Sequence, residues 1–115
     1  MPQSQLWLSD GNTRIPFLIS QIVYCLASNQ YCIIHYLDTD GITIKTFTAA
    51  IGLGILENKL MQHNFIRTGK SELVNLRYVS KFSTKGKGSV NVAIASMEFE
   101  LSVTAKQNLL SLTKI

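Results

Sequence analysis

Positive charge is concentrated in one short segment of this chain. Between Arg67 and Lys87 lie six of the eleven lysine and arginine residues and a single acid, Glu72. The formal charge of this segment is therefore +5, that of the rest of the chain is −1, and the total is +4. Such a cluster is a candidate contact for a polyanion, and it is also common on the solvated faces of soluble domains. Charge alone leaves both interpretations open.

The residues around these charges indicate a loop that is held at both ends. Residues 65–66 predict a short apolar strand, residues 68–69 a turn, and residues 73–74 a buried step before a strand over residues 76–82. A loop anchored in this way presents its side chains in fixed positions, as binding residues usually require. Arg67, Lys70 and Ser71 are expected to lie on this loop.

The spacing of six residues in this segment is that of a known family pattern: Phe65, Arg67, Lys70, Ser71, Val74 and Asn75. The segment thereby resembles the LytTR domain, the DNA-binding output domain of LytR/AlgR-type response regulators. The resemblance continues in residues 22–31, which are similar to the family's first core strand and turn, and in residues 101–104, which precede its last helix. Gly69 stands where histidine is usual and Ala105 where a basic residue often follows.

The resemblance implies a fold and a partner. The fold is mainly β with two helices, with small antiparallel sheets arranged as an elongated single domain over residues 1–115. Loops would enter successive major grooves of double-stranded DNA, at direct repeats in promoters, and regulate transcription. A dimer on DNA and a receiver or sensor partner are further expectations of this family.

Roles for individual residues follow from the same resemblance. Arg67 would contact a phosphate or a base at the centre of the site, and Lys70 would donate to guanine O6 and N7. Ser71 and Thr104 would hydrogen-bond to phosphates. Asn75 is expected to be structural and to tie the turn before the next strand.

A second contact loop is expected at residues 29–31. Asn29 and Gln30 are ordinary turn residues, and their amides also match the donor and acceptor pattern of adenine in the major groove. Composition favours the structural role, whereas the resemblance implies that these two residues and Tyr31 contact DNA.

Three lysines could add sequence-independent attraction to the phosphate backbone. Lys85 and Lys87 are framed by glycines, which suits either a mobile cationic tip or a soluble hairpin end. Lys106 is a candidate for the cation that Ala105 does not supply.

Alternation of apolar and polar residues predicts a series of strands. A hairpin is expected over residues 5–9 and 13–19, with Pro16 on an edge strand and Trp7 in the core or covering an edge. Further strands are expected at residues 22–28, 31–37, 42–46, 77–83, 88–95 and 97–103.

Helical spacing of leucines predicts two helices. The first runs over residues 49–61 with Thr48 as its N-cap. The second runs over residues 105–114 with Thr104 as its cap, and its leucines at 109, 110 and 112 are expected to pack inward.

Composition argues against catalysis and metal binding. Cys25 and Cys32 are expected to be reduced core thiols, because their places in the hairpin over residues 22–37 set them about 7 Å apart. With His35 and His63 they have no zinc-site spacing. Asp38 and Asp40 are interpreted as turn formers, so neither a metal, a cofactor nor an enzymatic activity is predicted.

At 115 residues and 46% hydrophobic composition, the chain is expected to be one soluble, cytoplasmic domain. No apolar run approaches the ~20 residues of a membrane span, and the start shows no leader pattern. The alternative to DNA recognition is a protein-interaction module that retains this fold without base-specific contacts, for which Gly69 and Ala105 are the sequence evidence.

Overall fold

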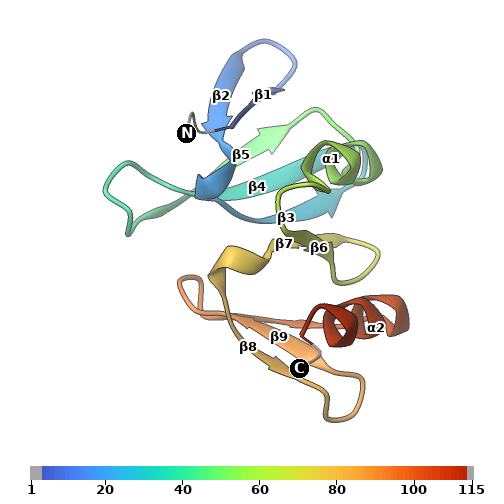
Figure 1. Ribbon diagram of the computed structural model, residues 1–115. Helices are drawn as coiled ribbons and strands as arrows, with labels where there is room; N and C mark the ends of the chain where they lie inside the picture. The colour runs from blue at the N-terminus through green and yellow to red at the C-terminus, as the bar shows by residue number, and fades with distance from the viewer. Residues whose placement is uncertain (1–3, 114–115) are drawn as a thin grey trace.

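The computed structural model describes residues 4–113 and shows ten strands and two α-helices over that range (Figure 1). The strands are β1 (Gln5–Ser9), β2 (Arg14–Leu18), β3 (Ile22–Ser28), β4 (Tyr31–Leu37), β5 (Ile44–Ala49), β6 (Phe65–Arg67), β7 (Glu72–Asn75), β8 (Val79–Ser83), β9 (Ser89–Val92) and β10 (Met97–Glu100). The helices are α1 (Leu53–Leu60) and α2 (Val103–Leu112), and short 3-10 turns occupy Ile19–Gln21 and Leu76–Tyr78.

The strands form three antiparallel sheets. The central sheet has the order β5-β4-β3-β7-β6, β1 pairs with β2, and the third sheet has the order β10-β9-β8. Figure 1 shows the β1–β2 hairpin and α1 on one side of the central sheet, and the third sheet with α2 on the other. The molecule extends 43 × 30 × 26 Å along its principal axes. The expected mainly β fold with small antiparallel sheets and two helices is confirmed.

Two apolar clusters hold the three sheets together. The first joins the β1–β2 hairpin and α1 to the central sheet, with Phe17, Leu56 and Leu73 among its buried members. The second joins the central sheet to the third sheet and α2, through residues that include Val74, Val90 and Leu109. Alternate residues of β3 point to opposite faces, so Ile22 belongs to the first cluster and Val23 to the second.

The register of the central sheet brings loops that are distant in the sequence to the same end of the sheet. Leu26 of β3 pairs with Glu72 of β7, and Cys32 of β4 pairs with Ala49 of β5. The β3–β4 turn and the β6–β7 loop therefore lie at the same end of the sheet, while the β4–β5 turn lies at the other end. In Figure 1 the β6–β7 loop is on the right and the β4–β5 turn on the left.

The first helix is shorter than expected. It begins at Leu53 with Gly52 as its N-cap, and Thr48 and Ala49 complete β5 instead. Ala49 is fully buried opposite Cys32, so pairing with β4 outweighs the capping tendency of Thr48. The expected helix start at residue 49 and the expected Thr48 cap are wrong.

The second helix begins two residues earlier than expected. Ser102, not Thr104, is its N-cap, and the Ser102 Oγ accepts a hydrogen bond of 3.1 Å from the Ala105 amide. The preceding strand accordingly ends at Glu100, which shortens the expected strand over residues 97–103. Of the three leucines expected to pack inward, Leu109 is buried, whereas Leu110 and Leu112 are 45% and 69% exposed.

Three other expectations need correction. Trp7 is 61% exposed, because it lies on the outer face of β1 opposite Pro16 and not on the face that carries Leu8. The expected strand start at residues 76–77 is a 3-10 turn, so β8 begins at Val79. The next strand ends at Val92 and not at residue 95, since residues 93–96 form the turn into β10.

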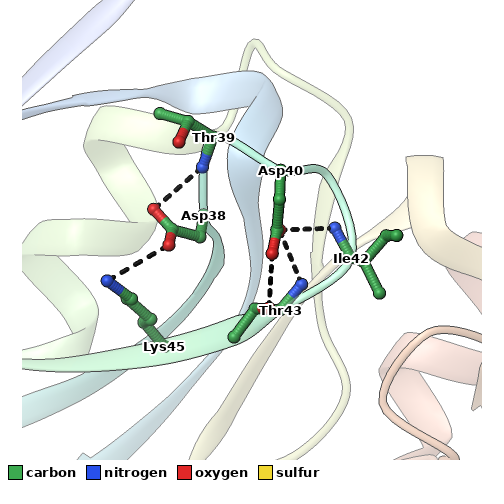
Figure 2. Close-up of polar contacts among 6 residues, drawn as sticks. All are labelled: Asp38, Thr39, Asp40, Ile42, Thr43 and Lys45. Carbon is green, nitrogen blue, oxygen red and sulfur yellow. Dashed lines mark hydrogen bonds and ion pairs between the residues drawn. The ribbon is translucent and has the colours of Figure 1, made fainter.

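The β4–β5 turn shows why its two acids are turn formers, as expected (Figure 2). Asp40 accepts hydrogen bonds from the amides of Ile42 and Thr43, both at 2.8 Å, and from the Thr43 hydroxyl. These bonds hold the pKa of Asp40 at about 2. Asp38 accepts from the Thr39 amide and pairs with Lys45 at 3.1 Å. Both carboxylates thus stabilise the turn by accepting hydrogen bonds from residues of that turn.

Both cysteines are buried and free, as expected. Ala27 pairs with Cys32 and Cys25 with Ile34, which is the register that keeps the two thiols diagonal. Burial raises the pKa of both thiols, most strongly that of Cys25.

The His35 ring is predicted to make stability depend on pH. It stacks on Tyr24 with centroids 4.1 Å apart, its Nε2 is buried without a hydrogen-bond partner in the described chain, and burial lowers its pKa below 6.5. The unfolded chain then takes up the proton first as the pH falls below ~6.5, so native stability decreases. Urea unfolding from pH 7 to 5 should show a shallower decline in the free energy of unfolding for His35→Phe. An equal decline in both proteins would contradict this.

Candidate nucleic-acid interface

The β6–β7 loop, residues 68–71, is fixed at both sides by backbone hydrogen bonds. The Ser71 carbonyl accepts from the Ala27 amide of β3 at 2.8 Å, and the Thr68 carbonyl accepts from the Ser102 amide before α2 at 2.7 Å. These partners are 44 and 34 residues away in the chain. The loop therefore lies between the β3–β4 turn and the start of α2.

Arg67 is the last residue of β6 and not a residue of the loop itself, where it was expected, and its half-buried side chain bonds to the loop. Its Nε donates to the Gly69 carbonyl at 3.2 Å, its Nη2 to the Lys70 carbonyl at 2.7 Å, and its Nη1 to Glu57 Oε1 of α1 at 3.0 Å. Three of the five guanidinium N–H groups are thus used within the protein, and the side chain is 33% exposed. Its expected contact with DNA stays a prediction, with two N–H groups free of the bonds described.

Thr68 and Gly69 shape the start of the loop. Thr68 is completely buried, and its hydroxyl lies 3.3 Å from Glu72 Oε1. A Cβ added to Gly69 would lie 3.1 Å from that same carboxylate oxygen. The carboxylate therefore occupies space beside residue 69, so a histidine at that position would require the Glu72 side chain to move.

Lys70 and Ser71 are the exposed residues of this loop. The side chain of Lys70 has no ion pair or hydrogen bond within residues 4–113. Arg67 binds the backbone carbonyl of Lys70, so the Lys70 backbone is held in place. The ammonium group at the end of its side chain remains available to a ligand.

The second expected loop lies at the same edge. Asn29 adopts the left-handed conformation with φ of 57°, which Asn tolerates better than most residues, and it forms the tight β3–β4 turn with Gln30. Asn29, Gln30 and Tyr31 are all exposed. Because Ser71 bonds to Ala27, two residues before Asn29, the sheet brings the two expected contact loops together.

The start of α2 borders the same loop. Thr104 is exposed in the first helical turn and lines a hollow of about 560 Å³ together with Arg67, Gly69 and Glu57. The structure thus places Thr104 beside the β6–β7 loop, although Thr104 is not the helix cap.

The three lysines form a separate group at the β8–β9 turn. The Lys106 Nζ donates to the Gly86 carbonyl at 3.0 Å, and Lys87 pairs with Glu100 at 3.3 Å. Lys85 and Lys87 are exposed in this turn, which lies at the lower right of Figure 1. Ala105 lies on the buried face of α2, so a cation at this end of the helix comes from Lys106.

Asn75 is structural, as expected. It is 3% exposed; its Nδ2 donates to the Ile22 carbonyl at 2.8 Å and its Oδ1 accepts from the Arg77 amide at 3.0 Å. These two bonds fix the end of β7 and hence the strand that leads out of the candidate loop.

Sequence reasoning missed three residues that support the loop. Ser102 could have been found, because a serine before a helical segment is a preferred N-cap. Glu57 and Thr68 gave no local signal, since their partners become neighbours only when α1, β6 and β7 pack together.

Residues 4–113 contain no group of three or more acidic, histidine or cysteine side chains placed to hold a metal ion. Neither helix within this range has the length and apolar character needed to cross a membrane.

Comparison with known proteins shows the family and the fold. The family model described as LytTr DNA-binding domain matches residues 12–113. Among solved structures, the LytTr DNA-binding domain of a putative methyl-accepting/DNA response regulator from Bacillus cereus is similar, with a TM-score of 0.75 and 17% sequence identity, over 99% of this chain and 100% of that one. A search of curated proteins gave no match.

Proposed function

The chain belongs to the LytTr DNA-binding domain family, and we propose that it is a transcriptional regulator domain whose loops recognise specific sequences in successive major grooves. Double-stranded promoter DNA with direct repeats is its proposed target. Binding as a dimer, and control by a receiver or sensor partner in the cytoplasm, are part of the same proposal.

The observation that carries this proposal is the hydrogen bond of 2.8 Å between the Ala27 amide and the Ser71 carbonyl. It supports simultaneous contact by the β3–β4 turn and the β6–β7 loop, since both project from one edge of a rigid sheet. The acids of the β4–β5 turn lie at the opposite end of β4, where they repel the phosphates least.

Base recognition is assigned to the two exposed loops. Lys70 would donate to guanine O6 and N7, and the amides of Asn29 and Gln30 would pair with adenine. Tyr31, which is 46% exposed, would pack against the DNA beside them.

Phosphate contacts are assigned to the residues around these loops. The hydroxyls of Ser71 and Thr104 would donate to phosphate oxygens, and the amides of the first turn of α2 would add a partial positive charge. Lys106 would supply a cation from the neighbouring group at the β8–β9 turn, where its Nζ donates to the Gly86 carbonyl. Arg67 borders the same surface with its two remaining N–H groups.

The lysines of the β8–β9 turn are expected to set general affinity. We expect the double substitution Lys85→Ala/Lys87→Ala to weaken binding to all duplexes about equally and to reduce the slope of log K against log salt by about 2. Fluorescence anisotropy over a salt series measures that slope. Lys45→Ala is the control, because Lys45 pairs with Asp38 at the opposite end of the sheet, and its slope should match that of the unchanged protein.

Selection of bound sequences from random duplex DNA, at a stated salt concentration, tests the function as a whole. A defined motif with two recognised elements about one helical turn apart is the expected result. Salt-dependent binding without any enriched sequence would contradict base recognition. The absence of duplex binding would instead favour a protein-interaction module on this fold.

A further inference from the structure

We infer that Arg67 is a positioning residue: it acts on DNA through Lys70, and Glu57 of α1 anchors it in that role. This inference rests on the proposed function, because it concerns how the β6–β7 loop is held for base recognition. It also gives α1, which carries none of the expected contacts, a part in DNA recognition.

The bonds of Arg67 are the first argument. The two carbonyl groups that it binds belong to Gly69 and Lys70, at 3.2 and 2.7 Å, so one planar guanidinium fixes two successive peptide groups. The Cα of Lys70, which carries the proposed base-contacting side chain, lies between these two peptide groups. A lysine at residue 67 would keep the charge but could not present three donors in this fixed fork geometry.

The third bond of Arg67 connects the loop to a different element. Glu57 Oε1 lies 3.0 Å from Arg67 Nη1, and Glu57 lies between the buried residues Leu56 and Leu60 of α1. The helix is packed in the first apolar cluster, so the backbone of Glu57 is fixed and its carboxylate orients the guanidinium through the 3.0 Å ion pair. Loss of that carboxylate would remove one of the three contacts that orient the guanidinium and so weaken its hold on the loop.

The sign of the charge makes this inference testable. Glu57 is an acid next to the proposed DNA surface, where a carboxylate that has no positioning role only repels phosphates. Its removal would then strengthen binding to every sequence. If Glu57 holds Arg67, its removal must instead weaken binding to the selected sequence and relax the preference at the base pair that Lys70 contacts.

The experiment compares Glu57→Gln, Arg67→Lys and Lys70→Ala for binding to the selected duplex, to single-base variants of it and to a random duplex. We expect Glu57→Gln and Arg67→Lys each to lower discrimination at the Lys70 base position by about 5-fold or more, as a lost bidentate contact would. Binding to the random duplex should be unchanged or tighter for Glu57→Gln. Neither substitution should reduce discrimination further when Lys70 is already Ala.

Glu98→Gln is the matched control, because Glu98 is an exposed acid of β10. It should tighten binding to all duplexes equally and leave every base preference intact. Thermal unfolding of each variant shows whether the domain remains folded. Amide hydrogen exchange at Ala27 and Ser102, whose N–H groups donate to the loop carbonyls of Ser71 and Thr68, should accelerate in Glu57→Gln but not in Glu98→Gln.

Two outcomes would overturn the inference while leaving the proposed function in place. One is a Glu57→Gln variant that behaves like Glu98→Gln. The other is an Arg67→Lys variant with full discrimination, which would make Arg67 a simple cation at the DNA surface. Failure of the unchanged protein to select any sequence would instead remove the proposed function itself.

Discussion

The double substitution Arg67→Ala/Lys70→Ala is expected to abolish sequence selection while the domain stays folded. It removes the proposed base contact of Lys70 and the guanidinium that fixes the Lys70 carbonyl at 2.7 Å. Discrimination should fall by roughly 1–3 kcal/mol at each base position that Lys70 contacts. Competition binding with single-base variants of the selected duplex measures this loss.

Folding should survive that substitution. The ion pair between Arg67 and Glu57 joins side chains that are 33% and 40% exposed, and such pairs contribute about 1 kcal/mol or less. The melting temperature should therefore drop by only a few degrees, as circular dichroism can show.

Arg77→Ala/Lys81→Ala is the control for that experiment. It removes one arginine and one lysine from the same basic segment, at exposed positions outside the β6–β7 loop. General affinity for DNA should fall in both double variants, but the control should select the same motif as the unchanged protein. Equal selection by the Arg67→Ala/Lys70→Ala variant would show that the loop does not contact the bases.

Leu73→Ala is expected to have the largest effect on stability. Leu73 is fully buried in β7, where it pairs with Cys25 of β3 and with Arg67 of β6. Truncating a buried leucine removes transfer energy and leaves a cavity, at a cost of about 2–5 kcal/mol. A domain of this size has a total stability of only ~5–15 kcal/mol, so a large part of it would be lost.

Urea unfolding measures that loss against a matched substitution. Leu112→Ala makes the same chemical change on α2 at a position that is 69% exposed, and it should change the free energy of unfolding by about 0.5 kcal/mol or less. Similar losses for the two variants would mean that β7 is not packed as described.

The Leu73→Ala substitution should also destabilise the β6–β7 loop. Because Arg67 pairs with Leu73 in the sheet register, a loosened β7 would release the base of the loop. Amide hydrogen exchange of Ala27 and Ser102, which donate to the loop carbonyls of Ser71 and Thr68, should then accelerate more than that of Ile42 and Thr43 in the β4–β5 turn, whose hydrogen bonds are local.

The strands and turns were largely predictable because their signals are local. Alternation along residues 22–28 and 31–37, with a turn of Asn29 and Gln30 between them, predicted β3, β4 and even the pairing of Ala27 with Cys32. The helix starts were harder to predict, because Thr48, Ser102 and Thr104 are all suitable N-cap residues by type. Ala49 joins β5 because it is buried against Cys32, and Ser102 is drawn to the start of α2 by bonds to Ala105 and Thr68.

The sequence by itself determined the family pattern, the class of fold and the identity of the cations, since these depend on residue type and on spacing along the chain. Only the tertiary structure decided what those residues do to one another: that Thr68 is buried, that Arg67 binds two loop carbonyls and Glu57, and that Ser71 is held beside the β3–β4 turn. The physical reason is that the contacts of Arg67 with Glu57 and of Ser71 with Ala27 join separate segments that pack together through the apolar clusters. No local pattern of residues predicts which distant segments will meet.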